Sequence, residues 1–332
     1  MHPVHKRSPS GLMASGFKLL ACVLTFVLIL AATVYFNPLW LADQVIRFRL
    51  WQQGVHSEYV SVSGYRIHYF EAAPLHGEVG TPLVLIHGLG SRGEDWAAMM
   101  PRLAAAGFHV YAPDLPGYGR SDRPDIAYTI SDEEKAAADF MRTMRIDHAD
   151  VAGASMGGWI AAKLTVDHPE LVERLALYDA AGVYFTPTYP PSVFTPKDSA
   201  GLTRLTSLLS PHPRHLPGFV ERAVFTRLQS NAWVINRSLA AMVSGRELLD
   251  FRLHSITQPT LIVWGSVDTL IPPASGEVMH RAIPQSVLTT VTGCGHLAPV
   301  ECSDAVTKAT IDFFNAQPAP ARGEATVPGS SR

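Results

Sequence analysis

The sequence predicts an α/β protein whose central sheet is mostly parallel, preceded by an apolar segment long enough to cross a membrane. Between residues 55 and 316, short apolar runs alternate with helical patterns, an order typical of parallel strands covered by helices on both faces. One apolar run leads into Gly-x-Ser-x-Gly at residues 153–157, a spacing typical of a sharp turn from a strand into a helix. Near the N-terminus, residues 19–36 carry no charge.

Composition excludes several classes of protein. The chain has 332 residues and a net charge of −2, without the basic excess of a nucleic-acid-binding protein, so we expect no nucleic-acid partner. Of the three cysteines, Cys22 lies in the apolar segment, so the count does not indicate a disulfide framework, and we expect Cys294 to be a small packed residue. Neither Cys294 nor Cys302 has metal-ligand spacing with the histidines, and we predict no metal and no organic cofactor.

Residues 19–36 are the predicted transmembrane anchor, because eighteen uncharged residues are just enough to cross the hydrocarbon core of a bilayer. The competing interpretation is a secretory signal peptide, which has a shorter apolar core and a small-x-small cleavage site. Here the run continues through Val34-Tyr35-Phe36, so we favour an uncleaved anchor. Basic residues are slightly more numerous before the anchor than after it: Lys6, Arg7 and Lys18 against Arg47 and Arg49. This balance predicts a cytoplasmic segment at residues 1–18 and a main domain on the opposite, periplasmic side.

Residues 37–54 form the predicted interfacial linker. Asn37-Pro38 ends the apolar helix, and Leu41, Val45 and Phe48 follow with the i, i+4, i+7 spacing of one helix face. A helix of this kind, with its tryptophans at the level of the lipid headgroups, is typical of the membrane interface. A helix that packs on the globular domain fits the same spacing equally well.

The core domain is predicted over residues 55–182 and 256–316. Ser63-Gly64 separates two runs of strand-forming residues, which indicates an antiparallel hairpin at the start of the domain. The expected parallel strands are 82–86, 109–112, 150–154, 171–178, 260–264 and 286–291. A capping box at residues 131–134 predicts the start of a helix, and the last helix is expected at 304–314.

Between residues 183 and 255 the alternation of strands and helices stops. This stretch is rich in proline at its start and helical in composition afterwards, so we predict that it is a cap inserted over the sheet. The sequence Pro318-Ala319-Pro320 follows the last helix, and residues 317–332 are predicted to form a disordered tail.

Reactive side chains follow the strands of the predicted sheet. Ser155 follows one strand, Asp268 follows the strand that ends in Trp264, and His296 follows the last strand. Ligands of open α/β sheets bind beyond the carboxyl ends of the strands, so we expect the serine, the aspartate and the histidine to meet at one edge. Asp179, at the end of an earlier strand, is the alternative acid.

Two further motifs end strands at the same predicted edge. They are His87-Gly88-Leu89-Gly90 and the stretch from Asp114 to Ser121. We expect His87 to be structural rather than a base, and Asp114 to accept hydrogen bonds from nearby backbone amides in a turn.

The chain order Ser155, Asp268, His296 resembles that of the α/β-hydrolases over roughly residues 59–314. The similarity is strongest to membrane-anchored monoacylglycerol lipase-type hydrolases and related bacterial lipases and esterases. They share the N-terminal anchor and three local motifs: Ser155-Met156-Gly157-Gly158, Trp264-Gly265-x-x-Asp268 and Cys294-Gly295-His296. The resemblance implies an α/β-hydrolase fold with an inserted cap and a serine hydrolase activity. It also implies an oxyanion hole formed by the backbone amides of Leu89 and Met156.

Catalytic roles follow from the chemistry of these three side chains. Ser155 would attack an ester carbonyl, His296 would take up its proton, and Asp268 would orient the imidazole. A serine at position 155 argues against the haloalkane dehalogenases and epoxide hydrolases, which use aspartate there.

The predicted substrate is a small acyl ester derived from lipids, such as a monoacylglycerol, with membrane lipids as the second partner. Aromatic residues gather at the start of the cap, where they suit an acyl chain or serve ordinary packing: Tyr184, Phe185, Tyr189 and Phe194. Between residues 182 and 255, eight Lys or Arg stand against four Asp or Glu, a balance that favours an anionic membrane surface. A carbon–carbon bond hydrolase, an amidase and a non-catalytic binding module are the alternative hypotheses.

Overall fold

A nine-stranded sheet forms the centre of the globular part of the chain in the computed structural model, which describes residues 9–74, 79–213 and 215–329. The strand order is β1-β2-β4-β3-β5-β6-β7-β8-β9. β2 pairs antiparallel with β1 and with β4, and every other neighbouring pair is parallel. The sheet is therefore mostly parallel with an antiparallel hairpin at its start, as predicted. The strands are β1 Val55–Val62, β2 Tyr65–Ala72, β3 Thr81–Ile86, β4 Phe108–Pro113, β5 Ala149–Ala154, β6 Val172–Tyr178, β7 Thr260–Gly265, β8 Ser286–Thr292 and β9 Gly323–Pro328.

Helices cover both faces of this sheet, and each face has its own buried apolar cluster. One cluster lies under α4, α5 and α9, and the other lies under α3 and α11. The central strand β3 is completely buried from Leu83 to Ile86, which explains its continuous apolar sequence. The helices are α3 Met100–Ala105, α4 Ile130–Thr143, α5 Met156–Asp167, α9 Ala274–Ala282, α10 Ala298–Glu301 and α11 Ser303–Asn315.

The capping box of α4 lies two residues earlier than predicted. Thr129 is the N-cap: its hydroxyl accepts a hydrogen bond from the Asp132 amide at 3.0 Å, and Asp132 accepts one from the Thr129 amide at 2.9 Å. Ser131 instead donates to the carboxylate of Glu247, which also accepts from the Ile130 amide at 3.0 Å. The end of the predicted cap is therefore bound to the first turn of α4, where an acidic side chain is favourable.

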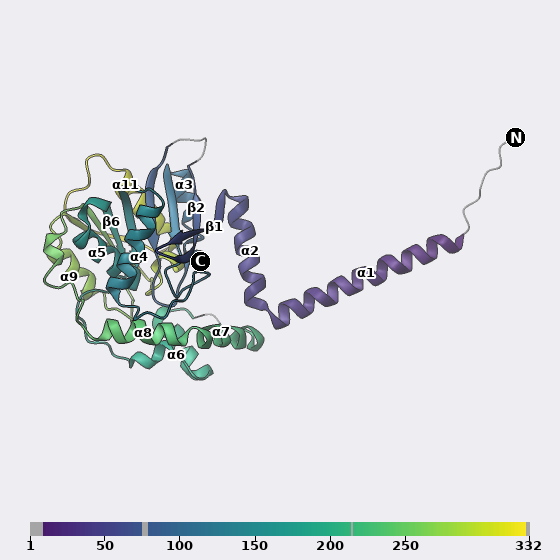
Figure 1. Cartoon of the computed structure of the whole chain (residues 1–332). Helices are drawn as coiled ribbons and strands as arrows, with labels where there is room; N and C mark the ends of the chain where they lie inside the picture. Colours follow the sequence, from purple (N-terminus) through teal and green to yellow (C-terminus); the bar gives the residue numbers. More distant parts are fainter. Residues whose placement is uncertain (1–8, 75–78, 214, 330–332) are drawn as a thin grey trace.

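The stretch predicted as a cap contains three helices beneath the carboxyl edge of the sheet, where Figure 1 shows them as one layer. They are α6 Ser199–Leu209, α7 Gly218–Ser230 and α8 Ala232–Val243. α8 buries Val234, Ile235 and Leu239, whereas no residue of α7 is fully buried. α6 also buries Leu202 and Leu205, so the buried residues of the three cap helices lie on α6 and α8.

The prediction of a disordered tail at residues 317–332 is wrong for the described residues up to 329. Gly323–Pro328 forms β9, which pairs in parallel with β8 from Val287 to Thr292. Arg322 fastens the start of β9 by donating to the carbonyl oxygens of His280 at 2.7 Å and Ile283 at 2.9 Å. Composition failed here because β8 would otherwise be an open edge, and its unpaired backbone groups can order a strand of low hydrophobicity.

The N-terminal helix α1, Pro9–Phe36, extends away from the domain (Figure 1). Its first turns contain the last residues of the predicted cytoplasmic segment, and residues 1–8 of that segment lie outside the described part of the chain. Its stretch Lys18–Phe36 is long and apolar enough to cross a membrane, and none of it is buried against the protein. A signal sequence shares these properties, so length and composition do not separate the two interpretations.

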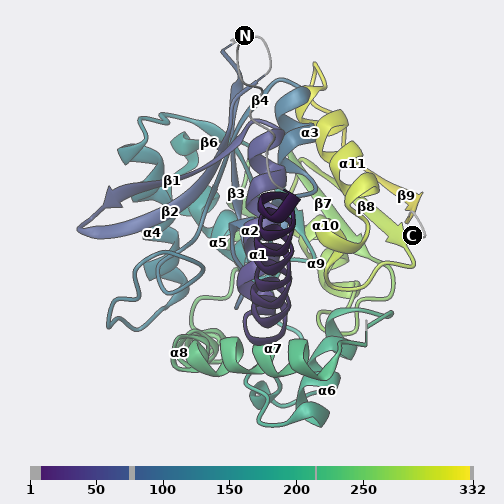
Figure 2. The same cartoon turned by 90° about the vertical axis from the view of Figure 1, so that its right-hand side faces the viewer.

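The linker helix α2, Pro38–Gln52, packs on the globular domain, which is one of the two interpretations drawn from its sequence. One face packs on the domain and buries Leu50. The opposite face leaves Trp40, Phe48 and Trp51 between 56% and 60% exposed. Viewed along α1, α2 lies against the domain directly behind α1, and α7 crosses below them (Figure 2). The helix therefore packs on the domain while presenting large aromatic side chains outward, beside the end of α1.

Candidate active site

Ser155 occupies the sharp turn between β5 and α5. Its backbone has a φ of 53°, a left-handed conformation that costs energy for any residue other than glycine. A side chain at Gly153 would overlap the Gly157 carbonyl, and one at Gly157 would overlap the Ile86 carbonyl. The two glycines of the motif are thus required by close packing of the turn against α5 and β3.

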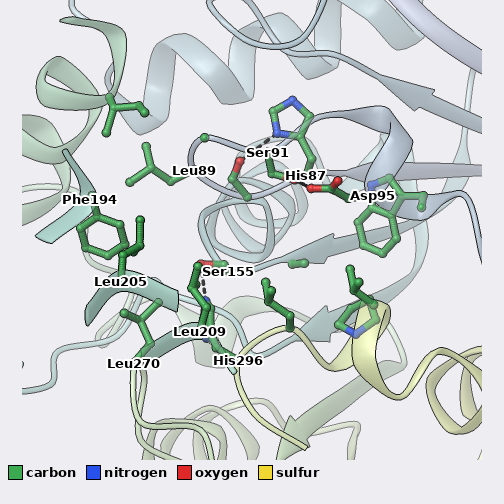
Figure 3. A pocket seen from close by; sticks show the side chains of 18 of the residues that line it. His87, Leu89, Ser91, Asp95, Ser155, Phe194, Leu205, Leu209, Leu270 and His296 are labelled. Carbon is green, nitrogen blue, oxygen red and sulfur yellow. Dashed lines mark hydrogen bonds between the residues drawn. The ribbon is translucent and has the colours of Figure 1, made fainter. Parts of the chain in front are cut away.

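His296 and Asp268 complete a hydrogen-bonded chain with this serine. The Oγ of Ser155 lies 2.9 Å from His296 Nε2, and His296 Nδ1 lies 2.8 Å from Asp268 Oδ2. Figure 3 shows the serine and histidine side chains pointing toward each other at one wall of a cavity. The second oxygen of Asp268 accepts hydrogen bonds from the amides of Leu270 at 2.8 Å and Ile271 at 3.0 Å. The structure therefore brings together the three side chains that the sequence predicts.

This arrangement has the geometry needed to activate a serine. Because Asp268 is acceptor-only when ionised, His296 carries its proton on Nδ1 and offers an unprotonated Nε2 to the serine hydroxyl. Both side chains are buried, which limits competition from water. The backbone amides facing Asp268 Oδ1 hold the carboxylate in place.

Asp179, the alternative acid, has a different set of partners. Its carboxyl group accepts hydrogen bonds from the amides of Gly265 at 2.7 Å and Ala298 at 3.2 Å. Burial and the neighbouring carboxylate of Asp268 raise the pKa of Asp179 well above its usual range. Asp179 thus joins the end of β7 to the start of α10, and the structure assigns the contact with His296 to Asp268.

Leu89 and Met156 belong to the two segments that lie next to the serine. Met156 is the first residue of α5, and the amides of a first helical turn have no partner within the helix. Leu89 follows β3 in a loop closed by a 3.2 Å hydrogen bond from the Ser91 amide to the Gly88 carbonyl. A side-chain carbon at Gly88 would lie 3.2 Å from Ser155 Cβ, so the glycine allows this loop to approach the serine closely.

His87 is placed as the sequence predicts, away from the role of a base. Its Nδ1 donates to the Gly88 carbonyl at 2.9 Å, and its Nε2 accepts from the Leu115 amide at 3.0 Å. Both ring nitrogens are used, and burial lowers the pKa of His87. A neutral His87 therefore holds the loops after β3 and β4 together.

Asp114 accepts backbone hydrogen bonds as predicted, and it has a further partner. Its carboxylate accepts from the amides of Gly93 at 2.7 Å and Arg120 at 2.8 Å. It also contacts Nδ1 of the buried His68, on β2, at 2.8 Å. The histidine was not predicted because sequence spacing gives no sign that β2 pairs with β4.

Sequence reasoning also missed an ionic contact of the linker helix. Asp43 on α2 binds Arg92 at 2.7 Å and Arg227 at 2.9 Å. Arg92 lies in the loop after β3, and Arg227 lies on the cap helix α7. One carboxylate thus joins the linker helix, the loop beside Ser155 and the cap, three segments that only the fold brings together.

Cys294 is packed as expected, but the cysteine count did not indicate its partner: Cys294 and Cys302 form a disulfide. Their Cα atoms are 6.3 Å apart, within the range that a disulfide spans. The short helix α10 turns the chain back so that Cys302 meets Cys294. A separation of eight residues gives no sign of such a turn in the sequence.

Two cavities meet at Ser155. The first, of about 180 Å³, lies between the loop after β3, the cap and the loop of His296 (Figure 3). The second, of about 410 Å³, extends beneath the cap on the other side of the serine. Leu89, Ser155, Phe194 and Leu270 line both. Within the described residues, no group of three or more His, Cys, Asp or Glu is arranged to hold a metal ion.

Known proteins share this fold and sequence pattern. Residues 81–301 match the family described as alpha/beta hydrolase fold. Lipase 3 of Moraxella sp. is 27% identical over 72% of this chain and 78% of its own length. The 2-hydroxymuconate semialdehyde hydrolase of Pseudomonas sp. is 30% identical over 67% of this chain and 82% of its own. A membrane phospholipase A, described as a bacterial virulence factor, has a crystal structure that superposes with a TM-score of 0.76 at 26% identity, covering 90% of this chain and 99% of that one. The chain therefore belongs to the alpha/beta hydrolase fold family.

Proposed function

We propose that this protein is a membrane-anchored serine hydrolase that cleaves lipid-derived carboxylic esters, such as monoacylglycerols, through an acyl-enzyme. The observation that carries the proposal is the hydrogen-bonded chain of Ser155, His296 and Asp268 at the meeting point of two cavities. Nucleophile, base and orienting acid are the parts that acyl transfer requires.

In the first half of the reaction, the Ser155 oxygen attacks the ester carbonyl while His296 Nε2 takes the hydroxyl proton. The backbone amides of Leu89 and Met156 stabilise the oxyanion, assisted by the positive end of α5. His296 then returns the proton to the leaving alcohol. Water repeats the sequence on the acyl-enzyme and releases the fatty acid.

The second cavity suits the acyl chain. Its lining is dominated by apolar and aromatic side chains, among them Trp159, Phe185, Leu239, Met242, Leu248 and Ile271. Burying each methylene of an acyl chain here contributes about 0.8 kcal/mol to binding. The first cavity, on the side of His296, is then left for the alcohol.

The position of the anchor supports a lipid substrate. A surface cavity of about 700 Å³ lies between the end of α1, the start of α2 and the cap helix α7. It shares Gly90, Ser91, Asp95, Leu228 and Ile235 with the first cavity beside Ser155. An ester at the membrane surface would therefore meet this opening first, with the exposed aromatic face of α2 in the headgroup region and the domain on the periplasmic side.

The similar proteins are named for two kinds of reaction. Lipase 3 and the membrane phospholipase A support ester hydrolysis, whereas the 2-hydroxymuconate semialdehyde hydrolase favours carbon–carbon bond hydrolysis as the second candidate. The apolar second cavity and the anchor favour the ester.

A substrate panel tests the choice. The full-length protein in detergent micelles is given monoacylglycerols, p-nitrophenyl esters of increasing chain length and 2-hydroxymuconate semialdehyde, with Ser155→Ala as control. We expect turnover of the esters by the wild type alone. Preferential turnover of the semialdehyde would contradict the proposal.

A further inference from the structure

The disulfide closes the loop that carries His296. Cys294 lies two residues before the histidine, and Cys302 follows α10. The bond therefore ties both ends of the segment 294–302 together around the proposed base, whereas Ser155 and Asp268 are held by ordinary backbone contacts.

Cys294 also contacts the loop of the acid. Its carbonyl accepts a 3.0 Å hydrogen bond from the Val267 amide, immediately before Asp268. One residue earlier on each loop, the Gly293 amide donates to the Ser266 hydroxyl at 2.9 Å. Fixing Cys294 therefore fixes the base loop against the acid loop.

The other attachments of the histidine loop are hydrogen bonds. Two residues after the histidine, the Ala298 amide donates to Asp179 at 3.2 Å. Closer to the histidine, the Gly295 amide reaches Glu301 Oε2 at 3.3 Å, and the His296 amide reaches the carbonyl of Leu209, on the cap, at 3.1 Å. The Gly295 contact is long for a hydrogen bond, and the His296 contact depends on the position of the cap. Among these attachments, only the disulfide is covalent.

The sulfur atoms are sealed beneath the end of β9. Cys294 and Cys302 are only 1% and 5% exposed. A side chain at Gly329 would lie 2.8 Å from the sulfur of Cys294 and 3.2 Å from that of Cys302. Thiol reductants attack a disulfide by direct contact with sulfur, so this covering protects the bond once the chain is folded.

We propose that the Cys294–Cys302 disulfide positions His296 against Asp268 and Ser155, so that full hydrolytic activity requires folding in an oxidising compartment. The inference rests on the proposed serine hydrolysis. It assigns Cys294 and Cys302 as positioning residues, because neither touches the reacting atoms.

The chemistry of bond formation sets where the enzyme becomes active. The two thiols lose two electrons and two protons to a disulfide donor, which is itself reduced to two thiols by exchange. Such donors are maintained outside the cytoplasm. A chain still in the reducing cytoplasm would have a loose histidine loop and low activity toward the lipids around it.

Full-length variants in detergent micelles test this proposal. We compare Cys294→Ala/Cys302→Ala with wild type, with Cys22→Ala as the thiol control. The matched structural control is Arg322→Ala, which removes the hydrogen bonds that hold the start of β9 beside the start of β8, at the end of β8 far from the disulfide. Readouts are kcat and KM on a short p-nitrophenyl ester, the rate of Ser155 labelling by a fluorophosphonate, the unfolding temperature, and the disulfide by mass spectrometry.

We expect the double variant to remain folded at the assay temperature and to lose about 10- to 100-fold in kcat, the scale of a misplaced catalytic group. Labelling should slow in parallel while KM stays within about twofold, because the second cavity, proposed for the acyl chain, has no residue of the segment 294–302 in its lining. Arg322→Ala should lower the unfolding temperature without this loss of kcat.

Two results would overturn the inference. One is a double variant with wild-type kcat and only a lower unfolding temperature, which would make the disulfide a stability element. The other is wild-type protein that is active with both thiols free. A wild type that is folded and oxidised but neither labelled nor active would refute the hydrolysis itself, and this inference with it.

Discussion

Replacing Asp268 by asparagine tests whether Asp268, rather than Asp179, orients His296. The Oδ1 atom of Asp268 accepts from two backbone amides, Leu270 and Ile271. An asparagine must keep its carbonyl oxygen there, so its NH₂ group replaces Oδ2, 2.8 Å from His296 Nδ1. A donor in that place forces Nδ1 to be an acceptor, and the proton moves to Nε2.

The wrong tautomer removes the base. With Nε2 protonated, His296 can no longer accept the proton of Ser155, although all three side chains keep their positions. In serine proteases the same change costs about 10⁴ in kcat, which corresponds to roughly 5.4 kcal/mol of transition-state stabilisation. We expect a loss of this size for Asp268→Asn on a p-nitrophenyl ester, with KM almost unchanged.

Asp179→Asn is the matched control, because it changes another buried carboxyl group of the same edge. Its raised pKa favours the neutral form, so asparagine preserves the charge and keeps the hydrogen bond to one amide. We expect kcat within about tenfold of wild type and a stability loss of about 1–3 kcal/mol from the second amide. A larger loss of kcat in Asp179→Asn than in Asp268→Asn would refute the assignment.

Three further outcomes are expected. Glu133 is buried, neither of its carboxylate oxygens has a hydrogen-bond partner among the described residues, and burial raises its pKa well above the usual range. The side chain is neutral when folded but ionises on unfolding, so the stability falls as pH rises above the unfolded pKa. Glu133→Gln should therefore raise the unfolding temperature more at pH 8 than at pH 5, and an equal shift at both pH values would argue against this cause. Gly295→Ala would place a carbon 2.6 Å from Pro211 of the cap, so kcat should fall. Adding Pro211→Ala should partly restore kcat, and no restoration would contradict a coupling between the cap and the histidine loop. Met242→Trp narrows the second cavity, so the preferred acyl chain should become shorter. The kcat/KM should fall roughly fourfold for each methylene that no longer fits, and an unchanged dependence on chain length would place the acyl chain elsewhere.

The position of the site could be predicted because it depends on strand order along the chain. Ser155 follows β5, and His296 follows β8, both at the carboxyl edge of one parallel sheet. The choice between Asp179 and Asp268 could not be settled in the same way. β6 and β7 are neighbouring strands, so both acids lie close to the histidine loop, and only the side-chain directions separate them.

Other features were beyond the sequence because they depend on contacts between distant segments. β9 is ordered by pairing with the open edge of β8, and the composition of the tail gives no indication that this edge is available. Asp43 meets Arg227 across 184 residues, and the helical pattern of α2 shows only that two faces exist. Long-range pairing of this kind requires the folded chain.

The measurement that tests the central claim most directly is mapping of the nucleophile. Full-length wild type, Ser155→Ala and His296→Ala are treated with a fluorophosphonate, and the labelled peptide is identified by mass spectrometry. We predict a single modification on Ser155 in the wild type, none in Ser155→Ala, and labelling at least about 100-fold slower in His296→Ala, because general-base assistance contributes on the order of 10²–10⁴. Labelling at another residue, or equal labelling rates with and without His296, would contradict the proposed site.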